Sequence, residues 1–181
     1  MMKKLFTDSS QIITSNTDGK NYKRGKELSE LEVLENHSIF CENGIIKDII
    51  PNHSIFKINF DEKVSLHGKV ILPGLIDCHT HTAFAGSRAN EFKEKIAGVH
   101  YEEIAKRGGG IIATVTAIRN SSLTDLVEIM KPKVQEFIAQ GVTTLEIKSG
   151  YGLDFENEIK LLHAIKIINE IFPIDIVSTF L

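Results

Sequence analysis

The last 40 residues of the sequence constrain the fold more strongly than any other segment. An apolar, β-branched run at 142–148 is followed by a helical pattern that Pro173 ends, and then by a second apolar run at 174–180. In the helical pattern, apolar residues recur every three or four positions. A strand, a helix and a further strand form a crossover unit, and such units join parallel strands. The sequence therefore predicts a parallel sheet of the α/β class.

A third strand of this sheet is predicted near residue 75, in the second half of a short apolar run at 70–77 that Pro73-Gly74 interrupts. The interval from residue 81 to residue 142 is about twice as long as an ordinary βα unit. We therefore expect extra helical structure there, over the mouth of a barrel. Apolar spacing predicts one helix at 111–118 and another at 123–138, with Ser122 as N-cap and Gly141 as the stop.

The first 70 residues are predicted to be β-structure. Two runs, 37–42 and 45–50, flank Asn43-Gly44, which is a strong hairpin signal because both turn positions tolerate positive φ. Alternation at 54–60 predicts a further strand, and the polar segment 15–30 predicts a long loop. We therefore expect a β domain at 1–70 and an α/β domain at 71–181.

The overall composition excludes several classes of protein. Lys+Arg number 21 against 24 Asp+Glu, so the net charge of −3 lacks the basic stripe typical of a nucleic-acid binder. No run approaches the roughly 20 apolar residues of a membrane span. The two cysteines, Cys41 and Cys78, cannot form a disulfide framework. We therefore expect a cytoplasmic protein that binds neither nucleic acid nor membrane.

His79 and His81 are the strongest chemical signal in the sequence. Side chains at i and i+2 of a strand point the same way, so a His-x-His pair there can share one ion. Neutral imidazole suits zinc or iron. Taken alone, the pair is equally compatible with two surface histidines on an edge strand.

The residues around the pair favour a shared metal ion over two surface histidines. The segment LPGLIDCHTH (72–81) resembles the signature of the amidohydrolase superfamily of metal-dependent hydrolases. Three further segments resemble the imidazolonepropionase family within it: DCHTHTAFAGSR (77–88), GGGI (108–111) and TTLEIKSGYGL (143–153). The resemblance extends from about residue 70 to Leu181 and is weak before residue 70.

The resemblance implies a fold and an activity. The fold is the start of a TIM-like (β/α)8 barrel, preceded by part of a small β-sandwich that both ends of the chain build together. The activity is hydrolysis of the cyclic amide 4-imidazolone-5-propanoate to N-formimidoyl-L-glutamate in histidine degradation. One zinc or iron ion binds the attacking water, with His79 and His81 as two of its ligands. The resemblance also implies a homodimer.

The resemblance further implies three substrate-binding residues. Arg88 is expected to bind the propionate of the substrate, since a guanidinium can form two parallel hydrogen bonds with a carboxylate. Tyr151, between two glycines, and Tyr101 are expected to contact the substrate as well. Taken alone, each of the three residues has an ordinary surface or packing explanation.

The family's remaining metal ligands and its acid/base carboxylates are expected beyond Leu181, so the catalytic residues are unknown here. We read the chain as the first part of a longer one and expect the 181 residues alone to bind metal weakly and to be inactive. The alternatives are another cyclic amidohydrolase or a deaminase of the same superfamily, or an inactive fragment.

Overall fold

The computed structural model describes residues 2–181, which divide into two compact units, one up to Pro73 and one from Gly74 to Leu181. Whether they correspond to domains at 1–70 and 71–181 stays a prediction.

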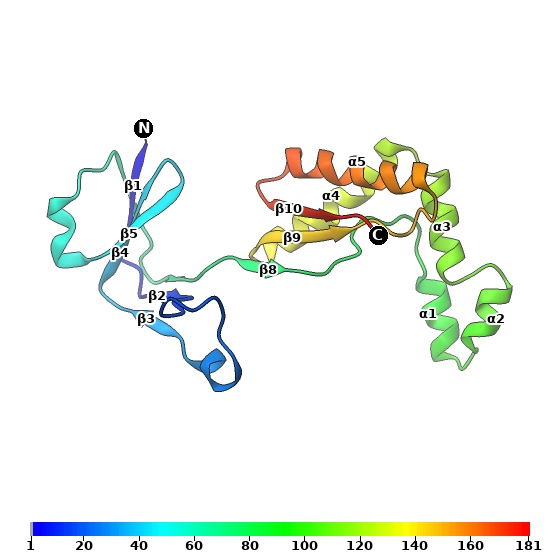
Figure 1. The fold of residues 1–181 in the computed structure, drawn as a ribbon, viewed down its shortest axis with the longest axis horizontal. Coiled ribbons are helices and arrows are strands. Elements are labelled where there is room, and N and C mark those ends of the chain that lie inside the picture. The colour runs from blue at the N-terminus through cyan, green and yellow to red at the C-terminus, as the bar shows by residue number, and fades with distance from the viewer. Residues whose placement is uncertain (1) are drawn as a thin grey trace. The chain divides into compact units, whose positions relative to one another are not determined.

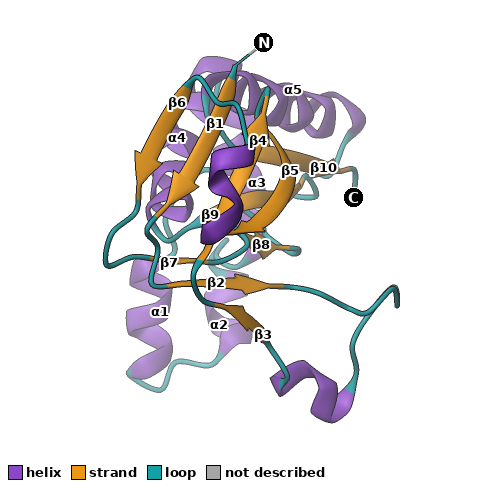
Figure 2. Cartoon of the chain, turned by 90° about the vertical axis from the view of Figure 1, so that its left-hand side faces the viewer, coloured by secondary structure: helices purple, strands orange, loops and turns teal. Residues whose placement is uncertain are grey.

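The first unit contains seven short strands and two 3-10 helices (Figure 1). In chain order these are β1 (Lys3–Thr7), β2 (Gln11–Thr14), η1 (Gly25–Ser29), β3 (Glu32–Leu34), β4 (His37–Glu42), β5 (Ile45–Pro51), η2 (Asn52–Lys57), β6 (Glu62–Ser65) and β7 (Val70–Ile71). The strands form two sheets, ordered β5-β4-β1-β6 and β3-β2-β7 (Figure 2). Leu5 and Ile12, one from each sheet, are almost completely buried.

The predicted hairpin is confirmed, and one predicted strand is wrong. Strands β4 and β5 pair antiparallel around Asn43 and Gly44, whose φ angles of 53° and 80° are those the tight turn requires. The expected strand at 54–60 is mostly the 3-10 helix η2. Apolar residues occur on both sides of that alternation, so the pattern did not define a buried strand face. The predicted loop at 15–30 contains the short helix η1.

The second unit contains a three-stranded sheet and five helices. The strands are β8 (Leu75–Asp77), β9 (Val142–Lys148) and β10 (Asp175–Thr179), and the helices are α1 (Ala89–Ile96), α2 (Tyr101–Lys106), α3 (Ile111–Asn120), α4 (Leu123–Ala139) and α5 (Phe155–Ile171). The sheet order is β10-β9-β8 and both pairings are parallel, as predicted. The interval between β8 and β9 holds four helices, which confirms the expected extra helical structure.

Helix boundaries in this unit follow from capping chemistry. The Ser122 hydroxyl accepts a hydrogen bond from the Asp125 amide, and the Asp125 side chain reaches back to the Ser122 amide, which completes a capping box. Asp154 caps α5 by accepting from the amide of Asn157. Gly141, with φ of 87°, follows α4 and turns the chain into β9.

Helices α4 and α5 lie on the same side of the sheet (Figure 1). Leu145 and Ile147 of β9 point toward them and are fully buried. They pack with apolar residues of both helices: Leu126, Met130, Val134, Leu161, Ile165 and Ile168. Because side chains alternate along a strand, Glu146 and Lys148 point to the opposite face of the sheet.

Glu146 and Lys148 form an ion pair of 2.6 Å, with side chains only 11% and 14% exposed. The Glu146 carboxylate also accepts a hydrogen bond from the amide of Thr80, at 3.0 Å. The Thr80 hydroxyl donates to the Glu146 carbonyl, and the Lys148 amide donates to the Thr80 carbonyl. These contacts attach the segment after β8 to the end of β9.

The charge on Glu146 is stabilised by these partners. Burial raises the pKa of the Glu146 carboxyl, but hydrogen bonds from Lys148, Thr179 and Thr80, with the charge of Lys148, outweigh it and lower that pKa from 4.5 to about 2. A carboxyl whose pKa falls on folding stabilises the native state above its unfolded pKa. That contribution is lost as the pH falls from 4.5 to 2.

None of the helices among residues 2–181 is both long enough and apolar enough to cross a membrane.

Leu161→Ala should lower the free energy of unfolding by about 2–5 kcal/mol, because it opens a cavity in the core of the second unit. Ile171→Ala is the matched control, since Ile171 lies on the same helix and is 48% exposed. It should cost less than about 1 kcal/mol. Urea denaturation monitored by circular dichroism measures both values. Equal losses in the two variants would contradict the core assignment.

Glu146→Gln should destabilise the protein by about 3–5 kcal/mol at pH 7, because Lys148 is left buried without its partner. Glu136→Gln, on the exposed side of α4, should cost less than about 1 kcal/mol. Between pH 4.5 and 2 the parent protein should lose more stability than Glu146→Gln does. Urea midpoints measured across this pH range test the expectation, and parallel losses in parent and variant would contradict it.

Candidate metal and substrate site

The two histidines lie just after β8, not on it. The strand ends at Asp77, so the expectation that His79 and His81 share a strand face is wrong. The position of the pair is set instead by Thr80, between them, through its hydrogen bonds to β9. The carboxylate of Asp77 accepts from the His79 amide at 3.3 Å.

The two imidazoles nevertheless lie together. Their ring centroids are 5.5 Å apart, with an interplanar angle of 63°. His79 is exposed and His81 is partly buried. Nδ1 of His81 is buried and has no hydrogen-bond partner among the described residues. A buried ring nitrogen without a partner is costly unless it binds something, so the pair fits a metal ligand set.

A complete set of metal ligands is not found in the part of the chain that the structure describes. Residues 2–181 contain no group of three or more His, Cys, Asp or Glu side chains that could hold one ion. Zinc centres normally use three or four protein ligands. Cys78, which follows the end of β8, is exposed.

A cavity of about 510 Å³ lies beside His81. Its lining includes three of the predicted site residues, His81, Arg88 and Tyr151, and also Phe84, Gly86, Ser87, Thr114, Ile129 and Lys133. The Tyr151 ring contacts the His81 ring, with centroids 5.3 Å apart. The structure therefore brings together residues separated by up to 70 positions in the sequence.

Arg88 lies at the start of α1 and is held by Glu91. Its Nε–H donates to the Glu91 carboxylate at 2.8 Å, and that carboxylate also accepts from the amide of Gly110. Hydrogen bonding to Arg88 lowers the pKa of the Glu91 carboxyl. The Arg88 side chain is 45% exposed. Within residues 2–181, no acceptor binds its two terminal amino groups, which leaves the planar fork to a ligand.

Tyr101 lies apart from Tyr151. It lines a second cavity of about 270 Å³, which it shares with Arg88, and it is half exposed. Its hydroxyl lies close to the backbone of Gly110, where a Cβ atom would be only 2.7 Å away. Arg88 is thus the residue common to the two cavities.

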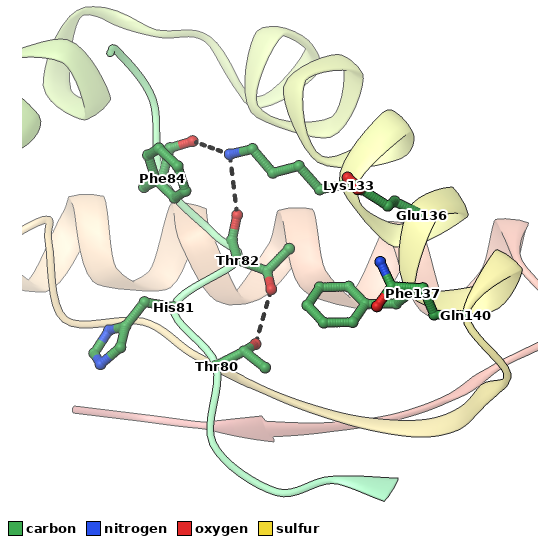
Figure 3. Close-up of a pocket in the computed structure, with 8 residues that line it drawn as sticks. All are labelled: Thr80, His81, Thr82, Phe84, Lys133, Glu136, Phe137 and Gln140. Atoms are coloured by element: carbon green, nitrogen blue, oxygen red, sulfur yellow. Dashed lines mark hydrogen bonds between the residues drawn. The ribbon is translucent and has the colours of Figure 1, made fainter. Parts of the chain in front are cut away.

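Lys133 also lines the cavity beside His81, although no motif in the sequence pointed to it. Its ammonium donates to the carbonyl of Phe84 at 3.1 Å and lies near that of Thr82, so it holds the chain just after His81 (Figure 3). Burial lowers the pKa of Lys133 from 10.5 to about 8. The available signal was its helical spacing, since it falls on the same face of α4 as Met130 and Phe137.

No family model matches the sequence. Individual relatives do match. The chain is 43% identical to the imidazolonepropionase of Aeromonas hydrophila over 155 residues, which cover 86% of this chain and 38% of that protein. It is also 43% identical to the imidazolonepropionase of Geobacillus kaustophilus over 161 residues, which cover 86% of this chain and 38% of that protein. With the imidazolonepropionase of Hyphomonas neptunium the identity is 54% over 114 residues, which cover 63% of this chain and 28% of that protein. The chain thus spans about two-fifths or less of these curated relatives.

Solved structures of low sequence identity share the fold. Guanine deaminase from E. coli matches with a TM-score of 0.66 at 14% identity, over 98% of this chain and 36% of that one. Atrazine chlorohydrolase from Arthrobacter aurescens, complexed with zinc, matches with a TM-score of 0.59 at 15% identity, over 98% and 35%. By sequence, the chain is a relative of the imidazolonepropionases and matches their amino-terminal part.

Proposed function

We propose that the protein hydrolyses 4-imidazolone-5-propanoate to N-formimidoyl-L-glutamate. The main observation in support of this proposal is that His81, Arg88 and Tyr151 line a single cavity. The cavity combines a group suited to a metal with one suited to a carboxylate. The similarity to imidazolonepropionases from three bacteria supports the same activity.

His79 and His81 would hold one zinc or iron ion, together with ligands from outside residues 2–181. The unpartnered Nδ1 of His81 and the proximity of the two rings support this role. When bound, such an ion acidifies water and polarises a carbonyl, which is the chemistry that hydrolysis of an amide requires. The zinc in the atrazine chlorohydrolase structure is consistent with a metal in a protein of this fold.

Arg88 would bind the propionate tail of the substrate. A guanidinium matches a carboxylate through two parallel hydrogen bonds, and Glu91 already holds Arg88 in one orientation through Nε. The tail is remote from the bond that breaks, so this contact would orient the ring. Tyr151, packed on His81, would contact the ring, and Tyr101 would approach the substrate from the adjoining cavity.

The remaining strands of a (β/α)8 barrel would complete this site. The parallel order of β8, β9 and β10, with α4 and α5 on one face of the sheet, is consistent with the first part of such a barrel. In that fold, the segments after the strands form the active site. His79, His81 and Tyr151 all lie in such segments.

The decisive experiment is an assay of the product of the complete gene, loaded with zinc or iron. We expect consumption of 4-imidazolone-5-propanoate and stoichiometric appearance of N-formimidoyl-L-glutamate. Guanine and a hydantoin serve as comparison substrates. Turnover of either of these, with none of the imidazolone, would overturn the proposal in favour of another hydrolase or a deaminase.

Arg88→Ala should lower kcat/KM by about 10- to 150-fold, since it removes a charge-assisted contact of about 1.5–3 kcal/mol. Arg88→Lys should recover part of the loss, because a point charge cannot reproduce the two-pronged contact. Arg107→Ala, an exposed arginine paired with Glu94, is the control and should have parental kinetics. Metal content should be unchanged in all three. Parental kinetics in Arg88→Ala would remove the support for a carboxylate-bearing substrate.

His79→Ala and His81→Ala should each lower metal affinity by about 100-fold or more, because changes outside the ligand shell alone cost about 10- to 100-fold. The measurement is metal content by mass spectrometry after dialysis against a competing chelator. His163→Ala, an exposed histidine on α5, is the control and should retain metal. Full retention in both test variants would show that the ion binds elsewhere.

A further inference from the structure

Glu158, in the first turns of α5, is a buried acid with no role in the proposed reaction. It is 4% exposed. Its carboxylate accepts hydrogen bonds from three backbone amides of the loop between β9 and α5. These come from Gly150 at 2.5 Å, Gly152 at 2.7 Å and Leu153 at 2.9 Å.

The two oxygens of this carboxylate bind on either side of Tyr151. Oε2 accepts from the amide of the preceding residue, Gly150, and Oε1 accepts from the amide of the following residue, Gly152. One carboxylate therefore fixes both peptide units next to the tyrosine.

The loop backbone adopts a shape that depends on such support. Gly150 has φ of 109° and Leu153 has φ of 53°, a left-handed conformation that a leucine rarely adopts. At Gly152 a Cβ atom would lie 2.7 Å from the Glu158 amide, so the loop packs directly on the start of α5. The guanidinium of Arg119 also donates to the Gly152 carbonyl, at 3.0 Å.

Burial raises the pKa of the Glu158 carboxyl, but the hydrogen bonds from Ser149, Leu153, Gly150 and Gly152 outweigh burial and leave the pKa below its ordinary value. The acid is therefore an anion at neutral pH and can only accept hydrogen bonds. A neutral amide in its place would present an N–H group to one of the loop amides.

We propose that Glu158 is a positioning residue that holds Tyr151 against His81 and in the wall of the substrate cavity. This inference rests on the proposed function in that it assigns the tyrosine to the substrate site. The Tyr151 ring has its centroid 5.3 Å from that of His81, so a rotation of either neighbouring peptide unit would move it. Small displacements of a contacting group are costly to catalysis.

The test is a double-mutant cycle in the active, metal-loaded protein. Glu158→Gln and Tyr151→Ala should each lower kcat/KM by about 10- to 100-fold. If Glu158 acts through Tyr151, the double variant should be no worse than the poorer single variant. Multiplied effects, about 100- to 10,000-fold in total, would overturn the proposal, because a general structural role does not depend on Tyr151.

Amide hydrogen exchange tests the contact without any assay of activity. In the parent, the amides of Gly150, Gly152 and Leu153 should exchange as slowly as those of β9, although they lie in a loop. Glu158→Gln should accelerate exchange at these positions and leave β9 unchanged. Glu156→Gln, an exposed acid on the same helix, is the matched control and should alter neither exchange nor kinetics.

Each outcome bears on a separate claim. Rapid exchange of the three amides in the parent protein would overturn the inference. A Glu158→Gln protein that fails to fold would also overturn it, because Glu158 would then support the whole second unit and not Tyr151 in particular. A parent protein that does not hydrolyse the imidazolone contradicts the proposed function, while the exchange measurement still tests the contact between Glu158 and the loop.

Discussion

Strand β9 is the element on which the rest of the second unit depends, because its two faces are stabilised by different means. Leu145 and Ile147 are buried against α4 and α5, where the gain comes from removing apolar surface from water. Glu146 and Lys148, on the other face, are stabilised by pairing with each other. Either charge alone would be expensive there, since a buried ion requires a partner and hydrogen bonds.

Strand β9 also positions two parts of the candidate site, the segment after β8 and the loop after β9. Through Thr80 it holds the segment that carries the two histidines, and it runs directly into the loop that carries Tyr151. Both segments are attached to this one strand. The helical insertion between β8 and β9 supports them further, because Lys133 binds the backbone after His81 and Arg119 binds the backbone after Tyr151. Arg88 comes from that insertion and has its own support in Glu91.

Two carboxylates with similar roles therefore lie behind the side chains that face the cavity. Glu91 binds Arg88 and the amide of Gly110, while Glu158 binds the amides on both sides of Tyr151. In both cases an anion accepts hydrogen bonds from the backbone of a glycine-containing segment. A carboxylate can satisfy several donors at once, so it can fix a loop that lacks regular secondary structure.

The sequence alone was sufficient to predict the parallel strands, the Asn43-Gly44 hairpin and the cap at Ser122. These depend on local periodicity and on the chemistry of a few neighbouring residues. The strand predicted at 54–60 failed because its alternation has apolar residues on both sides. The pattern there did not distinguish a strand from the 3-10 helix η2.

The sequence also determined the types of residue available for chemistry, since His79-Thr80-His81, Arg88 and Tyr151 were all identified from motifs. The tertiary structure decided which of them meet. It placed His81, Arg88 and Tyr151 around one cavity, left Tyr101 in the next, and added Lys133. It also decided how they are held, through Glu146, Glu91 and Glu158. The reason is physical: periodicity reports which face of an element is buried, whereas contacts between distant segments depend on how the elements pack in three dimensions.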